Sequence, residues 1–278
     1  MLMGGGVGGG VGMAARGSVG DQADIVETSG HATDGDVTIH RFNESEWDYD
    51  VRSRGRMRHD LFNPYNWVRF YLDRYLSGLG AASLLWLDCD TLVLADLTPL
   101  FRTPLHSPLA AVYSNESITN HLCPSVQSSA LPAATAINAG VLLMRFDVDW
   151  KRIRREWLSL KRRHEKRCIW RLPSQPELQL LVNISSLSPR WNAIYLGSER
   201  RFIASFLSPS AANLVSDAQG RPRQESLAVI RQHFSILHWA GPKKPWSAPN
   251  AYLGHIWRHA YHQHVRLLRS SSLTSPRS

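Results

Sequence analysis

Two aspartates, Asp88 and Asp90, stand one residue apart where an apolar run ends, within the stretch Ser83–Leu94. The unbroken run Leu84–Leu87 predicts a strand that is buried on both faces, as in a parallel α/β sheet. In a regular strand the two carboxylates would share one side, with their Cα atoms about 6.6 Å apart, and Cys89 would face away. Two carboxylates at this spacing suit Mg²⁺ or Mn²⁺. The pair therefore predicts a metal site that holds a phosphate group at the carboxyl end of a strand.

An Asp-x-Asp motif alone is a weak signal, because the chain contains a second one at Asp147–Asp149. That copy opens the basic segment Trp150–Leu158, so a helix cap at Asp147 and a dipole-complementing Asp149 are the favoured interpretation there. After Asp90, in contrast, Thr91–Leu94 continues the extended run. This difference favours the metal interpretation for the first pair.

A second polar block lies in Ile236–Trp246, where an apolar run ends at His238 and is followed at intervals of three by Gly241 and Lys244. His238 would be a third metal ligand, because neutral imidazole binds Mn²⁺. Gly241 would let the backbone approach a phosphate, and Lys244 would hold a diphosphate as a point charge. A lone histidine is more often structural and a lone lysine solvated, but the joint spacing favours a binding site.

Two amides are weaker candidates. Asn138 precedes Ala139 and Gly140 at the start of a buried run, and its donors and acceptor suit a hydroxyl-rich ligand, with a turn residue as the alternative. Gln175 lies where a helix is predicted to begin, with a capping or surface amide as the alternative. Four C-terminal histidines have partly helical spacing, which favours a solvated or partner-facing helix over a metal site. They are His255, His259, His262 and His264.

The composition bounds the partners and the compartment. The chain has 278 residues, of which 43% are hydrophobic, enough for one large domain or two small ones. A net charge of +9 and a pI of about 9.8 suit anionic partners. No nucleic-acid signature accompanies this charge, so nucleic acid is not expected, and a peripheral membrane contact is kept as an alternative. Three cysteines exclude a disulfide framework.

No apolar run reaches 18 residues, and the N-terminus lacks the layout of a signal peptide. Three glycosylation sequons hint at a lumenal protein. They lie at Asn43, Asn115 and Asn183.

The chain divides into a glycine-rich tail over 1–36, predicted to be disordered, a single domain over 37–268 and a disordered tail over 269–278. Within the domain, helical and strand-like patterns alternate, which predicts an α/β fold. The expected strands are 37–42, 84–87, 109–113, 137–144, 190–194 and 234–238. The expected helices are 67–76, 150–168, one opening at 173–176 and one from 251.

Taken together, these blocks resemble glycosyltransferase family 8, whose members are retaining, Mn²⁺-dependent enzymes of the GT-A fold that use mostly UDP-sugars. The resemblance covers roughly residues 60–250. It is carried by Asn66–Leu72, Trp86–Val93, Asn138–Leu143, Arg190–Asn192 and His238–Trp246. The Arg-Trp-Asn and His-Trp-Ala-Gly elements are similar to plant-type members related to galacturonosyltransferases. The implied fold is a mixed, mainly parallel sheet flanked by helices.

The resemblance implies a role for each candidate. Asp88, Asp90 and His238 hold Mn²⁺, with Mg²⁺ as the alternative. The substrate-binding residues would be Arg69, Asp88, Asn138, Ala139, Gly140, Gln175, Gly241 and Lys244. Of these, Gly241 and Lys244 would contact the diphosphate, Arg69 would lie by the diphosphate and the sugar, and Asn138, Ala139 and Gly140 would line the sugar and acceptor pocket. Gln175 and Asn138 serve the reacting sugar itself. The implied reaction is hexosyl transfer from a UDP-sugar to a hydroxyl of a saccharide or glycoconjugate, such as a cell-wall polysaccharide. The implied compartment is the Golgi or another secretory-pathway lumen.

Two departures from the family pattern motivate alternatives. Ser174 stands where the family commonly has an acid. The strand–helix–strand unit that binds uracil is expected to be partly missing before Asn66, which would leave an inner strand as an exposed sheet edge. A catalytically inactive binding protein of the GT-A fold is therefore the second hypothesis. A basic protein that binds membranes or nucleic acid is the third.

Overall fold

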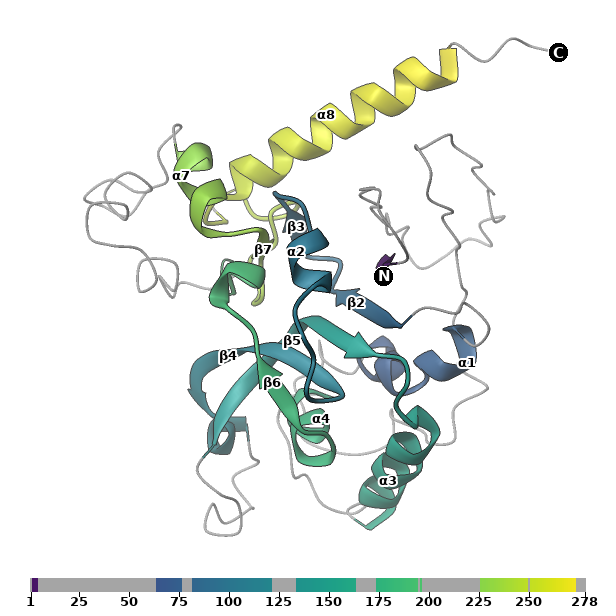
Figure 1. The fold of residues 1–278 in the computed structure, drawn as a ribbon. Coiled ribbons are helices and arrows are strands. Elements are labelled where there is room, and N and C mark those ends of the chain that lie inside the picture. The colour runs from purple at the N-terminus through teal and green to yellow at the C-terminus, as the bar shows by residue number, and fades with distance from the viewer. Residues whose placement is uncertain are drawn as a thin grey trace, which may run out of the picture. The chain divides into compact units, whose positions relative to one another are not determined.

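The computed structural model of the chain describes residues 2–4, 64–76, 82–121, 134–163, 174–194, 196, 226–249 and 251–273. The chain forms two compact units (Figure 1). The first unit comprises Met1–Leu87 and Thr98–Leu187, and the second comprises Asp88–Leu97 and Ser188–Ser278.

The first unit is built around a five-stranded sheet with the order β1-β2-β5-β4-β6. Its strands are β1 (Leu2–Gly4), β2 (Ser83–Leu87), β4 (Leu109–Ser117), β5 (Thr135–Arg145) and β6 (Ile184–Ser186). The central strand β5 has 11 residues, and Val141 to Met144 in its apolar run are all buried. Leu143 of β5 lies opposite Leu85 of β2 on one side and Ala110 of β4 on the other. The predicted strands at 84–87 and 137–144 are therefore confirmed, although Trp86 and Leu87 are only half-buried.

The α/β class and the mixed sheet are confirmed, but the expected predominance of parallel pairs is corrected. Among the described strands of this sheet, β1–β2, β2–β5 and β4–β5 are antiparallel, and only β4–β6 is parallel. The apolar runs of β2 and β5 reflect burial on both faces. Such burial is typical of parallel strands but does not determine strand direction.

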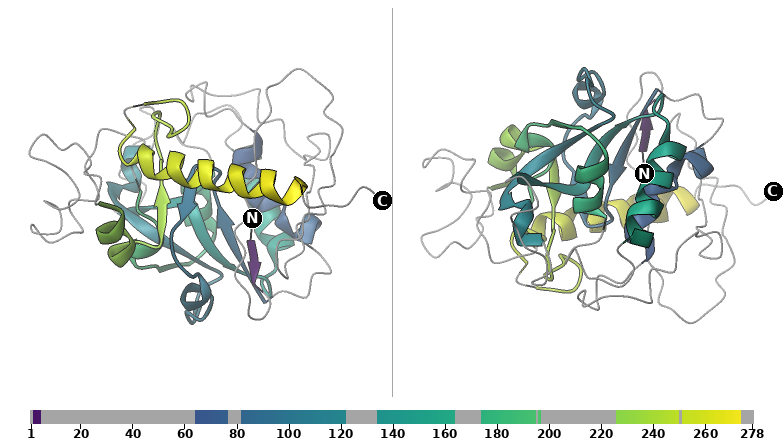
Figure 2. Two further views of the ribbon diagram at one scale, coloured as in Figure 1. Left: turned by 90° about the horizontal axis from the view of Figure 1, so that it is seen from above. Right: turned by 90° about the horizontal axis from the view of Figure 1, so that it is seen from below.

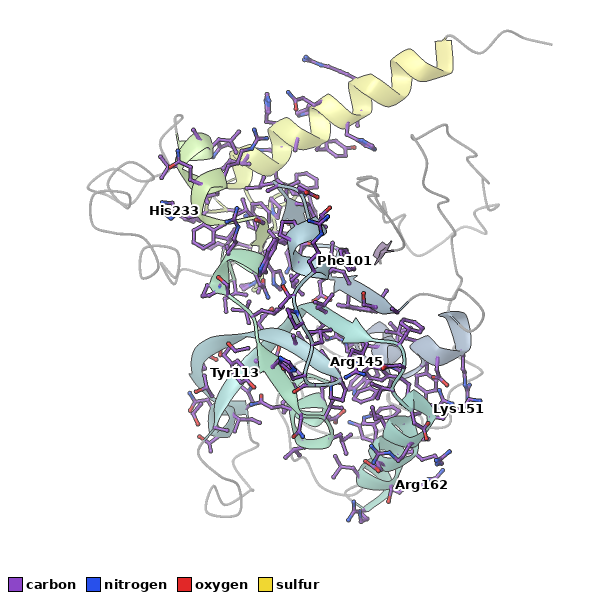
Figure 3. The ribbon with its side chains drawn as sticks, in the orientation of Figure 1. Phe101, Tyr113, Arg145, Lys151, Arg162 and His233 are labelled. Carbon is purple, nitrogen blue, oxygen red and sulfur yellow. The ribbon has the colours of Figure 1, made fainter. Side chains whose placement is uncertain are left out.

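The described part of the first unit also contains helices. They are η4 (Pro64–Phe70), α1 (Leu72–Leu76), α2 (Thr98–Phe101), η5 (Ile118–His121), α3 (Trp150–Arg163) and α4 (Gln175–Leu181). Viewed from below, α3 and α4 lie in front of the strands (Figure 2, right). The ring of Phe70 stacks on Trp157 of α3 with 4.7 Å between centroids. The opposite face of α3 is basic and exposed, as Lys151 and Arg162 show (Figure 3).

The N-terminus of α3 differs in one detail from the prediction. Asp149 caps the helix, because its Oδ1 accepts a hydrogen bond from the backbone N–H of Arg152 at 2.9 Å. Asp147 instead forms an ion pair with Arg145 of β5. The capping role predicted for Asp147 is therefore wrong, because the Asp147 carboxylate is paired with the Arg145 guanidinium and not with the helix N-terminus.

The second unit contains a two-stranded antiparallel sheet of β3 (Thr91–Val93) and β7 (Ile236–His238). Around it lie η7 (Pro189–Trp191), α7 (Ser226–His233) and α8 (Gly254–Leu273), the longest helix described (Figure 1). Their apolar side chains form a core of their own, with Leu237 and Trp239 completely buried at its centre. None of the described helices has both the length and the apolarity needed to cross a bilayer.

The tails are partly ordered. β1, which lies within the 1–36 segment, pairs with β2 at the edge of the sheet. At the other end, α8 continues to Leu273, past the boundary predicted at residue 268. The strand predicted at 37–42 lies outside the described residues, as does most of the segment where the uracil-binding unit is expected.

Candidate metal and donor site

The segment from Asp88 to Thr91 is a tight turn. Thr91 donates hydrogen bonds to the carbonyl oxygen of Asp88 from its backbone N–H at 3.2 Å and from its hydroxyl at 2.8 Å. A turn that the threonine hydroxyl stabilises therefore interrupts the predicted extended run at Asp88–Asp90, and the run resumes at Thr91 in a short strand. Asp88 and Asp90 thus lie in a turn, and the regular strand spacing assumed for them does not apply.

The pairing of β3 with β7 brings His238 next to this turn. Thr91 lies opposite His238 in the ladder, and the backbone N–H of Trp239 donates to the carbonyl oxygen of Asp90 at 2.9 Å. As a result, His238 Nε2 lies 3.2 Å from Asp90 Oδ1. One ligand atom each of Asp88, Asp90 and His238 lies within 4.8 Å of the other two. The structure therefore brings the three predicted metal ligands together from distant parts of the chain.

The carboxylate of Asp90 is the electrostatic centre of this group. The Lys244 ammonium forms an ion pair with Asp90 Oδ2 and also donates to the carbonyl oxygen of Trp239 at 2.9 Å. Burial opposes ionisation of Asp90, but His238 and Lys244 together outweigh it and hold the pKa of this carboxyl well below its usual range. Asp90 is thus a carboxylate at neutral pH, in the form that binds a cation.

This donor set fits a divalent cation. Asp90 and His238 are 7% and 3% exposed, so both ligands are shielded from solvent, and Asp88 is half-buried. Two carboxylate oxygens and one imidazole nitrogen are borderline-hard donors that suit Mn²⁺, with Mg²⁺ as a poorer match for the nitrogen. The three side chains would leave further coordination positions for phosphate oxygens and water.

The loop after β7 places Gly241 and Lys244. Gly241 has a φ of 119°, a conformation that residues with a Cβ rarely adopt, so glycine is required here by the backbone. Lys244 follows in the same loop and reaches back to Asp90. The structure therefore joins Lys244 to the acidic cluster. It shows no contact that would assign Gly241 to a phosphate, and that role stays a prediction.

The remaining predicted residues come together in the first unit, around the peptide of Ala139. Arg69 Nη1 donates to the carbonyl oxygen of Ala139 at 2.9 Å, and the N–H of Ala139 donates to Gln175 Oε1 at 3.0 Å. Arg69 is only 4% exposed, and its guanidinium lies 4.8 Å from the ring centroid of Trp86. Asn138 Oδ1 accepts from the N–H of Gly140 at 3.1 Å.

An irregularity in the sheet leaves this peptide open to side chains. Between Ala111 and Val112 of β4, the partner in β5 shifts from Leu142 to Asn138. On the other side of β5, the pairing with β2 ends at Val141. Ala139 has no partner in the registers of the described strands, and its backbone N–H and carbonyl oxygen are bonded instead to Gln175 and Arg69. Bulges of this kind are common beside active sites, where they redirect side chains.

Gln175 is held by the start of α4. The preceding Ser174 is buried and has a φ of 51°, a conformation uncommon outside glycine, and Pro176 follows in the first turn. One turn later, Gln179 Oε1 accepts from the N–H of Ile137 at 3.1 Å. Gln175 and Gln179 of α4 therefore both accept a hydrogen bond from the β5 backbone, Gln175 from Ala139 and Gln179 from Ile137.

Three residues that contribute to these groups had no predicted role. Asn192 Oδ1 lies 3.1 Å from His238 Nδ1, Trp86 contacts the Arg69 guanidinium, and Glu177, two residues after Gln175 in α4, is buried. An acid two residues after Gln175 among apolar residues was a visible signal for Glu177. For Asn192 and Trp86 the sequence shows only that they belong to the family-like motifs.

Comparisons with known proteins identify the family of the chain. The profile of glycosyl transferase family 8 matches residues 23–249. The probable galacturonosyltransferase-like 2 of Arabidopsis thaliana is 27% identical over 209 residues, which cover 68% of this chain and 54% of the relative. The glycosyltransferase 8 domain-containing protein 1 of Xenopus laevis is 24% identical over 226 residues, covering 70% and 54%. The chain thus spans about half the length of these curated relatives.

Solved structures that resemble the chain are glycosyltransferases as well. The galactosyltransferase LgtC, crystallised with donor and acceptor sugar analogs, has a TM-score of 0.46 and 20% identity, covering 74% of this chain and 68% of that one. GlyE of Streptococcus pneumoniae has a TM-score of 0.43 and 22% identity, covering 69% and 42%. Because the family profile spans most of the chain, this protein belongs to glycosyl transferase family 8.

Proposed function

We propose that the protein is a metal-dependent, retaining hexosyltransferase that moves a sugar from a UDP-sugar to an acceptor hydroxyl of a saccharide or glycoconjugate. The observation that carries this proposal is the convergence of Asp88, Asp90 and His238, with Lys244 ion-paired to the same cluster. Family membership supplies the reaction class, and the galacturonosyltransferase-like relatives favour a polysaccharide acceptor. Their names also favour a uronic acid as the transferred sugar.

In the second unit, the three ligands would hold Mn²⁺, with Mg²⁺ as the alternative. When bound, such an ion neutralises the charge that develops on the leaving diphosphate. Lys244, which pairs with the Asp90 carboxylate, adds a positive charge beside the proposed metal ligands. At Gly241 the lack of a side chain would let the backbone approach a phosphate. These residues therefore bind the nucleotide diphosphate and stabilise it as it departs.

In the first unit, Arg69 and Gln175 are proposed to serve the sugar. Both are fixed by the peptide of Ala139, so their remaining donors are oriented before any ligand binds. Asn138 and Gly140 line the same irregularity and would bind hydroxyl groups of donor or acceptor. No carboxylate is assigned as a nucleophile among these residues. The acceptor hydroxyl is therefore expected to attack on the face that the nucleotide leaves, which keeps the anomeric configuration.

The direct test is turnover of a panel of UDP-sugars, including UDP-galacturonic acid, with an oligosaccharide acceptor, with and without Mn²⁺. The proposal expects transfer only in the presence of the metal. Turnover that is unchanged after chelation would contradict metal dependence. Tight binding of UDP with Mn²⁺, but no transfer to any acceptor, would instead favour the inactive binding protein.

Replacement of Lys244 by methionine is expected to weaken binding of UDP in the presence of Mn²⁺ by about 10- to 100-fold, because a hydrogen bond to a charged group contributes about 1.5–3 kcal/mol. Isothermal titration calorimetry measures the affinity. Lys243→Met is the matched control, since Lys243 is the neighbouring residue of the same loop and its replacement removes the same charge. Equal losses in both variants would show a general effect of charge and contradict the assignment.

Replacement of Gln175 by alanine is expected to lower kcat by about 100-fold, the usual cost of losing one positioned polar group in an active site. Gln179→Ala is a close control, because Gln179 makes the same kind of contact to β5 one turn further along α4. Gln179→Ala also loses the hydrogen bond from Gln179 Nε2 to the carbonyl oxygen of Thr135 at 2.6 Å, so it should lose at least as much stability in thermal denaturation as Gln175→Ala. If kcat falls equally in both, Gln175 has only a structural role.

We also propose that the protein works in the lumen of the secretory pathway, with the Golgi as the compartment that the plant relatives favour. Asn183, in the sequon before β6, is exposed at the edge strand of the sheet, where a glycan has space. Expression in eukaryotic cells should give a product whose apparent mass falls on treatment with an endoglycosidase, with a smaller fall for Asn183→Gln. A product insensitive to the enzyme would contradict lumenal residence.

A further inference from the structure

Trp246, Trp257 and Tyr261 form a row of aromatic rings in the second unit, here called the aromatic row. The ring centroids of Trp246 and Trp257 lie 5.6 Å apart, and those of Trp257 and Tyr261 lie 5.2 Å apart at an interplanar angle of 8°. Trp246 is 47% exposed and Tyr261 is 42% exposed. Three large apolar side chains are exposed in the described part of the chain, and the row contains two of them. Clustered aromatic rings at a surface indicate a binding site more strongly than scattered apolar residues do.

The aromatic row joins the loop of the proposed donor site to α8. Trp246 follows Lys244 by two residues, whereas the other two rings lie one turn apart on the helix. Arg258 of α8 fixes this junction. Its Nη1 donates to the carbonyl oxygen of Pro245 at 3.1 Å, and its Nη2 donates to that of Pro249 at 3.4 Å. The rings are therefore held in place before a ligand binds, and less conformational freedom is lost on binding.

The helix that carries most of the row is basic. The sequence of α8, Gly254–Leu273, contains three arginines, four histidines and no acidic residue. His259, His262 and Arg266 are exposed and follow one another at intervals of three and four residues, so they share one face of the helix. The ring of His262 also contacts Tyr261, with 5.7 Å between centroids. This basic face lies beside the aromatic row and favours an anionic partner.

The histidines of α8 do not converge on a metal site within the ranges that the structure describes. The group of three or more potential ligands found there consists of Asp88, Asp90 and His238. This agrees with the interpretation of α8 as a solvated or partner-facing helix.

A chain of acidic sugars matches both the rings and the charge. The C–H groups on the face of a sugar ring carry a small positive charge, so they pack against the negative face of an aromatic ring. The carboxylate groups of such a chain would meet the basic face, and arginine binds carboxylates through two parallel hydrogen bonds. A lipid surface or a nucleic acid would also suit a basic helix. The row begins, however, in the loop of Lys244, and saccharides are the substrates of the proposed function.

We propose that the aromatic row, together with His259, His262 and Arg266, is a docking surface for an acidic saccharide chain that continues from the acceptor. The proposal rests on the function proposed above for its choice of a saccharide ligand. Sugars bound here would lie beyond the reacting hydroxyl and would hold the acceptor near the site, which favours long acceptors over short ones.

Isothermal titration calorimetry of the full chain with an oligomer of galacturonic acid, without UDP or metal and at one fixed pH, tests the proposal. Tyr261→Ala is expected to weaken binding about 2- to 10-fold, the range for loss of one aromatic contact. Tyr261→Phe keeps the ring and should retain the native affinity. Arg266→Ala removes a charge and should weaken binding about 2- to 5-fold. An uncharged oligomer of galactose of the same length should bind the native protein more weakly.

Two control variants lie in the first unit. Leu180→Ala shortens the third exposed apolar side chain, which is 42% exposed, and Arg162→Ala removes an exposed arginine of α3. Both should leave the affinity for the acidic oligomer unchanged. Equal weakening by these controls would overturn the proposal, because the binding would then reflect general properties of the surface. If Tyr261→Ala does not fold, Arg266→Ala and the uncharged oligomer still test the surface.

The proposal is also overturned if Tyr261→Ala and Arg266→Ala bind the acidic oligomer as the native protein does. Weaker binding of these variants to phosphatidylserine vesicles or single-stranded DNA, with unchanged binding of the oligomer, would assign the surface to another partner. Conversion of a dimer into a monomer by Tyr261→Ala would assign it to a second copy of the chain. A failure of the proposed function looks different, because the chain would then bind the oligomer through Tyr261 but transfer no sugar to it.

Discussion

Replacement of Asp90 by asparagine is expected to reduce metal-dependent sugar transfer by at least about 1,000-fold. The carboxylate faces His238 and Lys244 and offers one of the two anionic ligand atoms of the proposed metal site. Asparagine preserves its shape but removes the charge, so the several kcal/mol that a bound metal contributes to the transition state would be lost. The measurement is kcat/KM for the best UDP-sugar at saturating Mn²⁺.

Asp96→Asn is the matched control, because Asp96 belongs to the same short segment, 88–97, but is exposed and is not among the grouped ligands. It should keep kcat/KM within about twofold, as surface substitutions usually do. Circular dichroism should show that both variants are folded. An Asp90→Asn enzyme that retains more than a tenth of native kcat/KM would rule out Asp90 as an essential ligand.

Replacement of Glu177 by alanine should lower the free energy of unfolding of the first unit by about 3–5 kcal/mol, the usual cost of breaking a buried ion pair. Glu177 is 2% exposed, and its Oε2 accepts from the indole N–H groups of Trp67 at 2.9 Å and Trp157 at 2.7 Å. Its Oε1 forms an ion pair with Lys161 of α3. One carboxylate thus joins η4, α3 and α4, and its loss leaves two buried donors without this acceptor.

Denaturation by urea, followed by tryptophan fluorescence, measures the effect. Glu156→Ala is the control, because Glu156 pairs with Arg152 on the exposed face of α3 and should matter by less than about 0.5 kcal/mol. Since α4 carries Gln175, Glu177→Ala should also reduce turnover at temperatures where the protein remains folded. Equal stability of the two variants would show that the carboxylate is not needed to join these helices.

The sequence was sufficient to predict the site residues that lie in local motifs. The Asp-x-Asp pair and the His238–Lys244 spacing could be recognised because each lies where an apolar run meets polar residues. Their convergence required the resemblance to a known family, since the ladder that pairs Thr91 with His238 joins segments about half the chain apart. The grouping of Arg69, Ala139 and Gln175 was predicted on the same basis and is seen in the structure.

Other features could not be predicted because they depend on pairing between distant segments. Apolar runs indicated buried strands but not their directions, which the antiparallel pairing of β2 with β5 now establishes. The turn at Asp88 is stabilised by the contact of the Thr91 hydroxyl with the Asp88 carbonyl oxygen. Threonine is also enriched in strands, so its presence did not predict a turn. The contact of Asn192 with His238 depends on the isolated bridge between Ala193 and Leu237, which the hydrophobic pattern of the sequence does not predict.

The central claim is that Asp88, Asp90 and His238 bind one divalent cation, and pulsed electron paramagnetic resonance of protein-bound Mn²⁺ tests it most directly. In protein labelled with ¹⁵N-histidine and mixed with UDP, the account predicts a coupling from one directly bound imidazole nitrogen. The coupling should be absent in His238→Gln and Mn²⁺ binding much weaker in Asp90→Asn. A tightly bound Mn²⁺ without nitrogen coupling, or a coupling that persists in His238→Gln, would contradict the account.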